Sequence, residues 1–148
     1  MIQRIQTLYV LLSSILIGLL FALPFAEIAD ATNQIFEFNA FGVEGNAGLL
    51  QNGWAVSLLI GIILILQIVV VFLFKNRILQ MRILTFVILL SLGLTGLLFF
   101  FVVKSFDDAT ISYQITMSFP IIAAILDYLA IRAIGKDEAL IRSVDRIR

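Results

Sequence analysis

The chain has 148 residues, of which 61% are hydrophobic and 14% are charged, whereas a soluble domain carries about 25% charged residues. This composition excludes an ordinary soluble protein. The 10 cationic and 10 acidic side chains balance, so net charge indicates neither nucleic acid nor an acidic partner. The absence of cysteine and histidine excludes disulfides, thiolate chemistry and imidazole ligands.

Four apolar runs dominate the sequence, each close to the roughly 20 residues that cross a hydrocarbon core of about 30 Å. They cover residues 8–25, 54–74, 83–103 and 117–134. We therefore predict one domain over residues 1–148, an all-α membrane protein built as a four-transmembrane-helix bundle.

The first apolar run superficially resembles a signal peptide. It is longer than an h-region of about 7 to 15 residues, and Pro24 fits a cleavage site poorly. We expect a retained first helix that Pro24 ends or kinks. Ser14, Gly18 and Ala22 fall four residues apart, which predicts a close contact with a neighbouring helix, unless the spacing is chance in a segment rich in small residues.

The first outer loop, residues 26–53, contains four acidic residues and no lysine or arginine. Within it, Phe36–Ala40 alternates apolar with polar residues, which predicts a short strand. The glycines that follow predict turns. Asn52 is a candidate N-terminal cap for the second helix, and Trp54 lies where an interfacial anchor is expected.

Gln67 is the one polar residue in the interior of the second helix, over Gly61–Phe74. We interpret it as a structural hydrogen-bonding group between helices, in preference to a ligand. The short connection after Phe74 predicts an antiparallel hairpin with the third helix. Small residues of that helix predict a close crossing; they are Ser91, Gly93, Thr95 and Gly96.

The second outer loop, residues 104–116, leads into a strict alternation over Thr110–Phe119. This pattern predicts a strand. Because an isolated strand is unstable, we expect it to pair with Phe36–Ala40 in a small extracytoplasmic β-sheet. Ser118 is then a candidate cap for the fourth helix, with Pro120 in its first turn.

The cationic residues are placed asymmetrically. Of the 10 lysines and arginines, only Lys104 falls on the outer side of this arrangement. The positive-inside rule therefore predicts that both termini are cytoplasmic. The same bias argues against dual-topology insertion.

Asp127 is the one acidic residue inside an apolar run, and an intramembrane carboxylate is by default a functional-site hypothesis. Three interpretations stay open. It is a proton or cation site, a structural partner of Arg77, Arg82 or Arg132, or a shallow group hydrated near the headgroups. We favour the structural pairing. Ala123 and Ala130 share its helix face, which aims the acid at a neighbouring helix.

The tail, residues 135–148, predicts a short amphipathic cytoplasmic helix, with apolar positions at Leu140, Ile141, Val144 and Ile147. Such a helix is marginal alone and needs a surface: headgroups, its own bundle or a partner protein. Its charges are too balanced for a lipid anchor, so we favour protein, with a frayed solvated end as the alternative. The candidate partner-binding residues are Glu138, Arg142, Asp145, Arg146 and Arg148.

Catalysis is not expected. One membrane carboxylate does not make an aspartyl protease, no base serves a serine nucleophile, and no phosphate loop, metal cluster or cofactor motif occurs. We predict a non-enzymatic structural or accessory subunit of a membrane protein complex. The alternative is a small transporter or channel protomer that uses Asp127. Expected partners are the bilayer and a membrane protein or a second copy, with no nucleic acid, cofactor or small-molecule substrate.

Both ends of the chain carry recognisable motifs. The start MIQRIQT, the close KDEALIRSVDRIR, the Lys75-Asn76-Arg77 connection, and Tyr113 with Pro120 resemble a family of bacterial integral membrane proteins, domain of unknown function 4293. The resemblance implies four helices in the cytoplasmic membrane of a Gram-negative bacterium. It implies no substrate or reaction. Four helices with outer strands are also similar in architecture to claudin-like proteins, by fold analogy alone.

Overall fold

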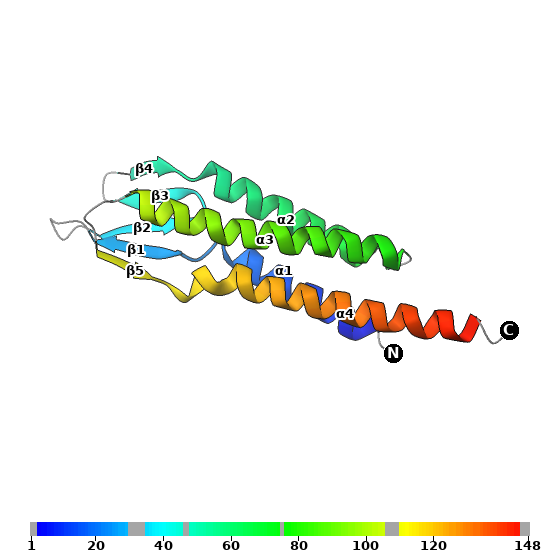
Figure 1. The fold of residues 1–148 in the computed structure, drawn as a ribbon. Coiled ribbons are helices and arrows are strands. Elements are labelled where there is room, and N and C mark those ends of the chain that lie inside the picture. The colour runs from blue at the N-terminus through cyan, green and yellow to red at the C-terminus, as the bar shows by residue number, and fades with distance from the viewer. Residues whose placement is uncertain (1–2, 30–34, 46–47, 75, 106–109, 146–148) are drawn as a thin grey trace.

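The computed structural model describes residues 3–29, 35–45, 48–74, 76–105 and 110–145. Its helices are α1 (Gln3–Leu19), α2 (Trp54–Phe72), α3 (Arg77–Ser105) and α4 (Phe119–Asp145). Its strands are β1 (Ala26–Ala29), β2 (Ile35–Asn39), β3 (Gly42–Gly45), β4 (Gly48–Asn52) and β5 (Thr110–Tyr113), and the 3-10 helix η1 covers Ile115–Ser118. The helices run side by side with the sheet at one end, and α1 begins and α4 finishes near the other end (Figure 1).

Within the described residues, three helical segments are long and apolar enough to cross a membrane: Trp54–Phe72, Arg77–Val103 and Ile115–Leu140. The apolar part of the remaining helix, Ile5–Leu19, is shorter. α1 packs against α2 and α4, and α3 also packs against α2 and α4, so each helix has two neighbours. The chain is thus mostly helical, as predicted, and α2 and α3 form the predicted hairpin.

Most of the core is apolar, and so is much of the outer surface. At the sheet end, the rings of Phe25 and Phe38 pack edge to face, with their centroids 5.2 Å apart. Both belong to the same buried cluster as residues of the helices, so they attach the sheet to the helices. On the outer surface Phe72, Ile65 and Leu89 are 72%, 62% and 61% exposed. Apolar side chains on both faces are compatible with helices surrounded by lipid.

The five strands form one antiparallel sheet in the order β4-β3-β2-β1-β5. The strand predicted at Phe36–Ala40 is present as β2. The prediction for Thr110–Phe119 was wrong in length and partner, because only Thr110–Tyr113 is a strand and it pairs with β1. Gln114 is the last residue held against this region, since its backbone N–H donates to Phe25 O at 3.0 Å and its side chain donates to Glu27 at 2.8 Å, and η1 begins at the next residue.

The glycine-rich segment predicted as turns also forms strands, β3 and β4. Asn39 Oδ1 starts the β2–β3 turn by accepting from the N–H groups of Phe41 and Gly42, and Gly42 has a φ of 140°, which favours glycine. A Cβ on Gly53 would lie 2.7 Å from the Gly42 nitrogen. Asn52 Oδ1 accepts from Trp54 N–H at 3.1 Å, but the N-cap of α2 is Gly53, without a side-chain cap, so the prediction of Asn52 as the cap was wrong by one residue.

Several boundaries differ from the predicted ones. α1 ends at Leu19, although hydrogen-bonded turns continue to Leu23. α4 passes through Gly135 without a break to Asp145, so the prediction of a separate tail helix was wrong. A single glycine costs a helix only about 1 kcal/mol, and at Gly135 a Cβ would lie 4.0 Å from Met81 Sδ of α3, so the segment packs on the bundle there.

The glycines for which close helix contacts were predicted do not lie against a neighbouring helix. A Cβ on Gly18, Gly93 or Gly96 would meet nothing within 4 Å, so the predicted contacts at these positions were wrong. At the start of α4, Pro120 lies in the first turn as expected. The Ser118 hydroxyl donates to Ile115 O at 2.6 Å, a bond within η1 in place of the expected cap.

Candidate functional site

A polar layer crosses the apolar interior of the bundle, formed by Ser13 of α1, Gln67 of α2 and Asp127 of α4. All three side chains are completely buried. Gln67 Nε2 donates to Ser13 Oγ at 2.6 Å and to Asp127 Oδ2 at 3.1 Å. Ser13 Oγ in turn donates to Ala123 O at 3.2 Å. One amide therefore connects three helices.

The helical repeat explains how the layer forms. Gln67 continues the buried seam of α2, whose other members are Val56, Ile60, Ile63 and Val70. On α4, Asp127 shares its face with Ala123 and Ala130, which are both buried, as the sequence indicated. The small alanines leave room for α1, so Ser13 reaches the α4 backbone.

Not every polar atom of the layer is satisfied. In the part of the chain that the structure describes, Asp127 Oδ1 and Gln67 Oε1 are buried without a hydrogen-bond partner, as is Ser91 Oγ on α3. A carboxylate and an amide oxygen are both acceptors. The layer therefore offers lone pairs to a donor or a small cation, and a buried acceptor left unpaired costs about 1–3 kcal/mol.

Arg132 lies apart from this layer, although the sequence placed it with Asp127 and Gln67. It is exposed on α4, and the partner of Asp127 is Gln67, where an arginine was expected. Five residues separate Asp127 from Arg132, which turns the two side chains about 140° apart around the helix. The expected pairing of Asp127 with Arg132 was wrong for this geometric reason.

A second polar contact joins α1 to α4 nearer their ends. Gln6 Nε2 donates to Asp137 Oδ2 at 2.7 Å, and the two side chains are only 6% and 8% exposed. Sequence reasoning missed Gln6, Ser13 and Asp137. The antiparallel packing that sets Ser13 beside Ala123 also brings Gln6 to Asp137, but this register follows from the α1–α4 contact and is not readable from either segment alone.

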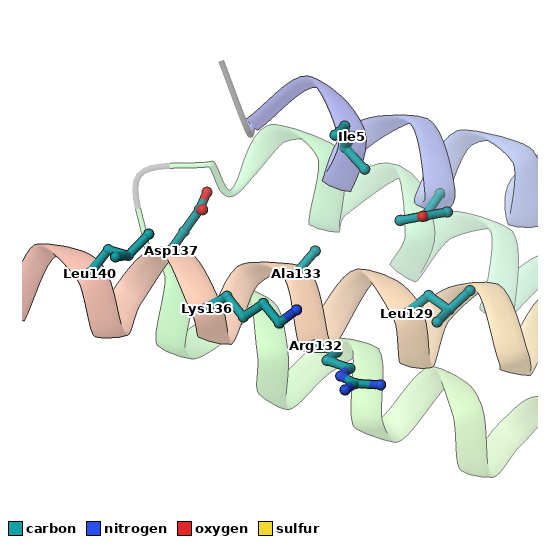
Figure 2. Close-up of a pocket in the computed structure, with 8 residues that line it drawn as sticks. Ile5, Leu129, Arg132, Ala133, Lys136, Asp137 and Leu140 are labelled. Atoms are coloured by element: carbon teal, nitrogen blue, oxygen red, sulfur yellow. The ribbon is translucent and has the colours of Figure 1, made fainter.

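A groove of about 450 Å³ lies beside this contact, between α1 and α4. Its wall includes Ile5, Tyr9, Leu129, Arg132, Ala133 and Lys136, with Asp137 and Leu140 at one end. Figure 2 shows Ala133 facing α1 and Asp137 directed toward the start of α1, while Lys136 extends along α4 toward Arg132. Arginine and lysine thus flank an otherwise largely apolar hollow.

The predicted partner-binding tail is only partly described. Glu138 is half-buried on α4. Arg142 and Asp145 belong to the same helix, but their side chains lie outside the described residues, as do Arg146 and Arg148 altogether. The role of these five residues stays a prediction.

The comparisons with known proteins give one match. The sequence model of the domain of unknown function 4293 (DUF4293) matches residues 2–147. No curated protein and no solved structure matches the chain.

Proposed function

We propose that this chain, which belongs to the domain of unknown function 4293 family, is a non-enzymatic integral membrane protein that serves as a structural or accessory subunit of a membrane protein complex. In this proposal four helices span the cytoplasmic membrane of a bacterium. Both termini are cytoplasmic, and the sheet lies on the outer side.

Two observations support four spans with this orientation. α1 has 17 residues, about 26 Å of helix, and the hydrogen-bonded turns up to Leu23 extend its apolar path toward the roughly 30 Å of a hydrocarbon core. Arg77 and Arg82 lie near the start of α3, which begins away from the sheet (Figure 1), whereas on α4, which begins near the sheet, Arg132 is the middle residue and Lys136 lies beyond it. That distribution is the one the positive-inside rule favours for a cytoplasmic face.

The observation that carries the subunit role is how the two buried acids are used. Asp127 and Asp137 each accept a hydrogen bond from a glutamine on another helix, Gln67 and Gln6. These acids thus hold helices together, which is a structural task. Exposed charges remain at the helix ends, where a protein partner or a second copy is able to engage them.

Crosslinking in native membranes followed by mass spectrometry tests this role. We expect the tail to crosslink to a membrane protein or to another copy of the chain. Purification in mild detergent as a monomer, with no crosslinked partner in cells, would contradict the proposal.

A second candidate function is a small transporter or channel protomer with Asp127 as its proton or cation site. The unpartnered Asp127 Oδ1 beside Gln67 favours it. Asp127→Asn distinguishes the two. Loss of an ion flux with unchanged assembly supports the transporter, whereas reduced yield or stability without any flux in the native protein supports the structural role.

A further inference from the structure

The groove between α1 and α4 combines two properties that a lipid headgroup site needs. It is open to the surroundings along the helices, and its wall carries two cations, Arg132 and Lys136 (Figure 2). The Gln6–Asp137 hydrogen bond ties the two helices together beside it, so the two walls are held at a fixed separation.

Arg132 and Lys136 are four residues apart on α4, so they project from one helix face on successive turns. Both are exposed, and no ion pair joins either one to another residue in the described ranges. Asp137 also borders the groove, but it is buried and already accepts from Gln6. Two cations against one acid leave the groove with a net positive charge.

The apolar part of the groove continues along the bundle toward the sheet. On α4 the face of Leu129 continues as Ile125 and Ile122, which are 55% and 41% exposed. On α1 the face of Ile5 and Tyr9 continues as Leu12, at helical spacing. A chain of methylenes lying on this surface therefore buries apolar area on both helices.

We propose that this groove binds one anionic phospholipid. Arg132 and Lys136 contact its phosphate, and one acyl chain lies over Leu129 toward Ile125. Basic pockets between membrane helices on the cytoplasmic side suit anionic headgroups, and arginine forms two parallel hydrogen bonds with a phosphate. A free phosphate would use the cations but leave the apolar wall uncovered, so the lipid is the occupant that matches the whole groove.

Native mass spectrometry of the protein in detergent tests the proposal. Phosphatidylglycerol, phosphatidylcholine and inorganic phosphate are added separately. We expect saturable binding of one phosphatidylglycerol, weaker binding of phosphatidylcholine and none of phosphate. Each cation near an anionic lipid contributes about fivefold in affinity, so the double substitution Arg132→Gln with Lys136→Gln should weaken phosphatidylglycerol binding about 30-fold.

Two further variants distinguish binding in the groove from a general attraction between anionic lipid and any exposed cation. Arg82→Gln removes an exposed cation from α3, outside the groove, and should leave binding unchanged. Ala133→Phe keeps both cations and fills the hollow, so it should weaken binding as well. The proposal is overturned if the double variant binds like the native protein, if phosphatidylcholine binds equally, or if inorganic phosphate competes at equal concentration.

Discussion

Removing the amide of Gln67 tests whether the buried polar layer holds the bundle together. Gln67→Leu breaks the 2.6 Å bond to Ser13 and the 3.1 Å bond to Asp127. Asp127 then stays fully buried, with Oδ1 unpaired and Oδ2 without the amide of Gln67. Leaving a buried acceptor without its partner costs about 1–3 kcal/mol, so we expect Gln67→Leu to lower the free energy of unfolding by that order.

A double-mutant cycle with Asp127 should show that stability is partly recovered. Asp127→Val in the Gln67→Leu background removes the orphaned acid, and replacing a whole buried pair by apolar residues is often nearly neutral. We therefore expect the double variant to be more stable than Gln67→Leu alone, with a coupling energy of about 2 kcal/mol or more. Reversible unfolding in mixed micelles, followed by circular dichroism, measures all four proteins.

A matched control uses another buried glutamine. Gln80 on α3 donates to Val70 O at 3.2 Å and shares no partner with Asp127. Gln80→Leu and Asp127→Val should therefore add within about 0.5 kcal/mol. If the effects of Gln67→Leu and Asp127→Val on the free energy of unfolding also add within about 0.5 kcal/mol, the two side chains do not stabilise the protein through their hydrogen bond. Interhelical hydrogen bonds in bilayers average about 0.6 kcal/mol, so a coupling that small is likewise evidence against an orphaned acid.

Three other outcomes follow from the packing. Gly53→Ala should lower the melting temperature measurably, because its Cβ would lie 2.7 Å from the Gly42 nitrogen. At Gly61 an added Cβ meets nothing within 4 Å, so Gly61→Ala should be neutral or raise stability by up to about 1 kcal/mol. Equal effects of the two substitutions in a thermal melt would refute the reasoning. Asp137→Leu should speed hydrogen exchange in the first turns of α1 by removing the partner of Gln6, and unchanged protection there would show that this bond does not fasten α1. Ser13→Ala removes an acceptor of Gln67 and the donor to Ala123 O, so it should cost about 1 kcal/mol in unfolding free energy, and no loss would contradict its role.

Composition and periodicity predict much of this fold because they act over short distances. The three long apolar helices follow from runs near Trp54, Ile83 and Met117, and β2 follows from a five-residue alternation. The α2–α3 hairpin follows from its short connection. Each of these features is decided by neighbours along the chain.

The errors come from contacts between distant segments. The alternation after Tyr113 fits a strand, but the chain enters η1 after Gln114, which is held by Phe25 O and by the Glu27 side chain of β1. Gly135 predicts a break in an isolated helix, but α4 continues beside Met81 of α3.

The candidate site shows the same division. Gln67 and Asp127 are each recognisable as lone polar groups in apolar runs, and the structure brings them together. Arg132 is near Asp127 in the sequence, but the turn of the helix points the two side chains in different directions. Ser13, Gln6 and Asp137 carry no signal until the register of α1 on α4 is known.

Labelling of introduced cysteines tests the orientation of the helices most directly, because the native chain contains no cysteine that would react. Glu37→Cys places a thiol at an exposed position of β2, and Asn76→Cys places one at an exposed position between α2 and α3. The cells are treated so that a membrane-impermeant maleimide reaches only the outer face of the cytoplasmic membrane. The thiol at position 37 should then react, whereas the thiol at position 76 should stay protected until the cells are lysed. Labelling at position 76 from outside, or protection at position 37, would contradict the account.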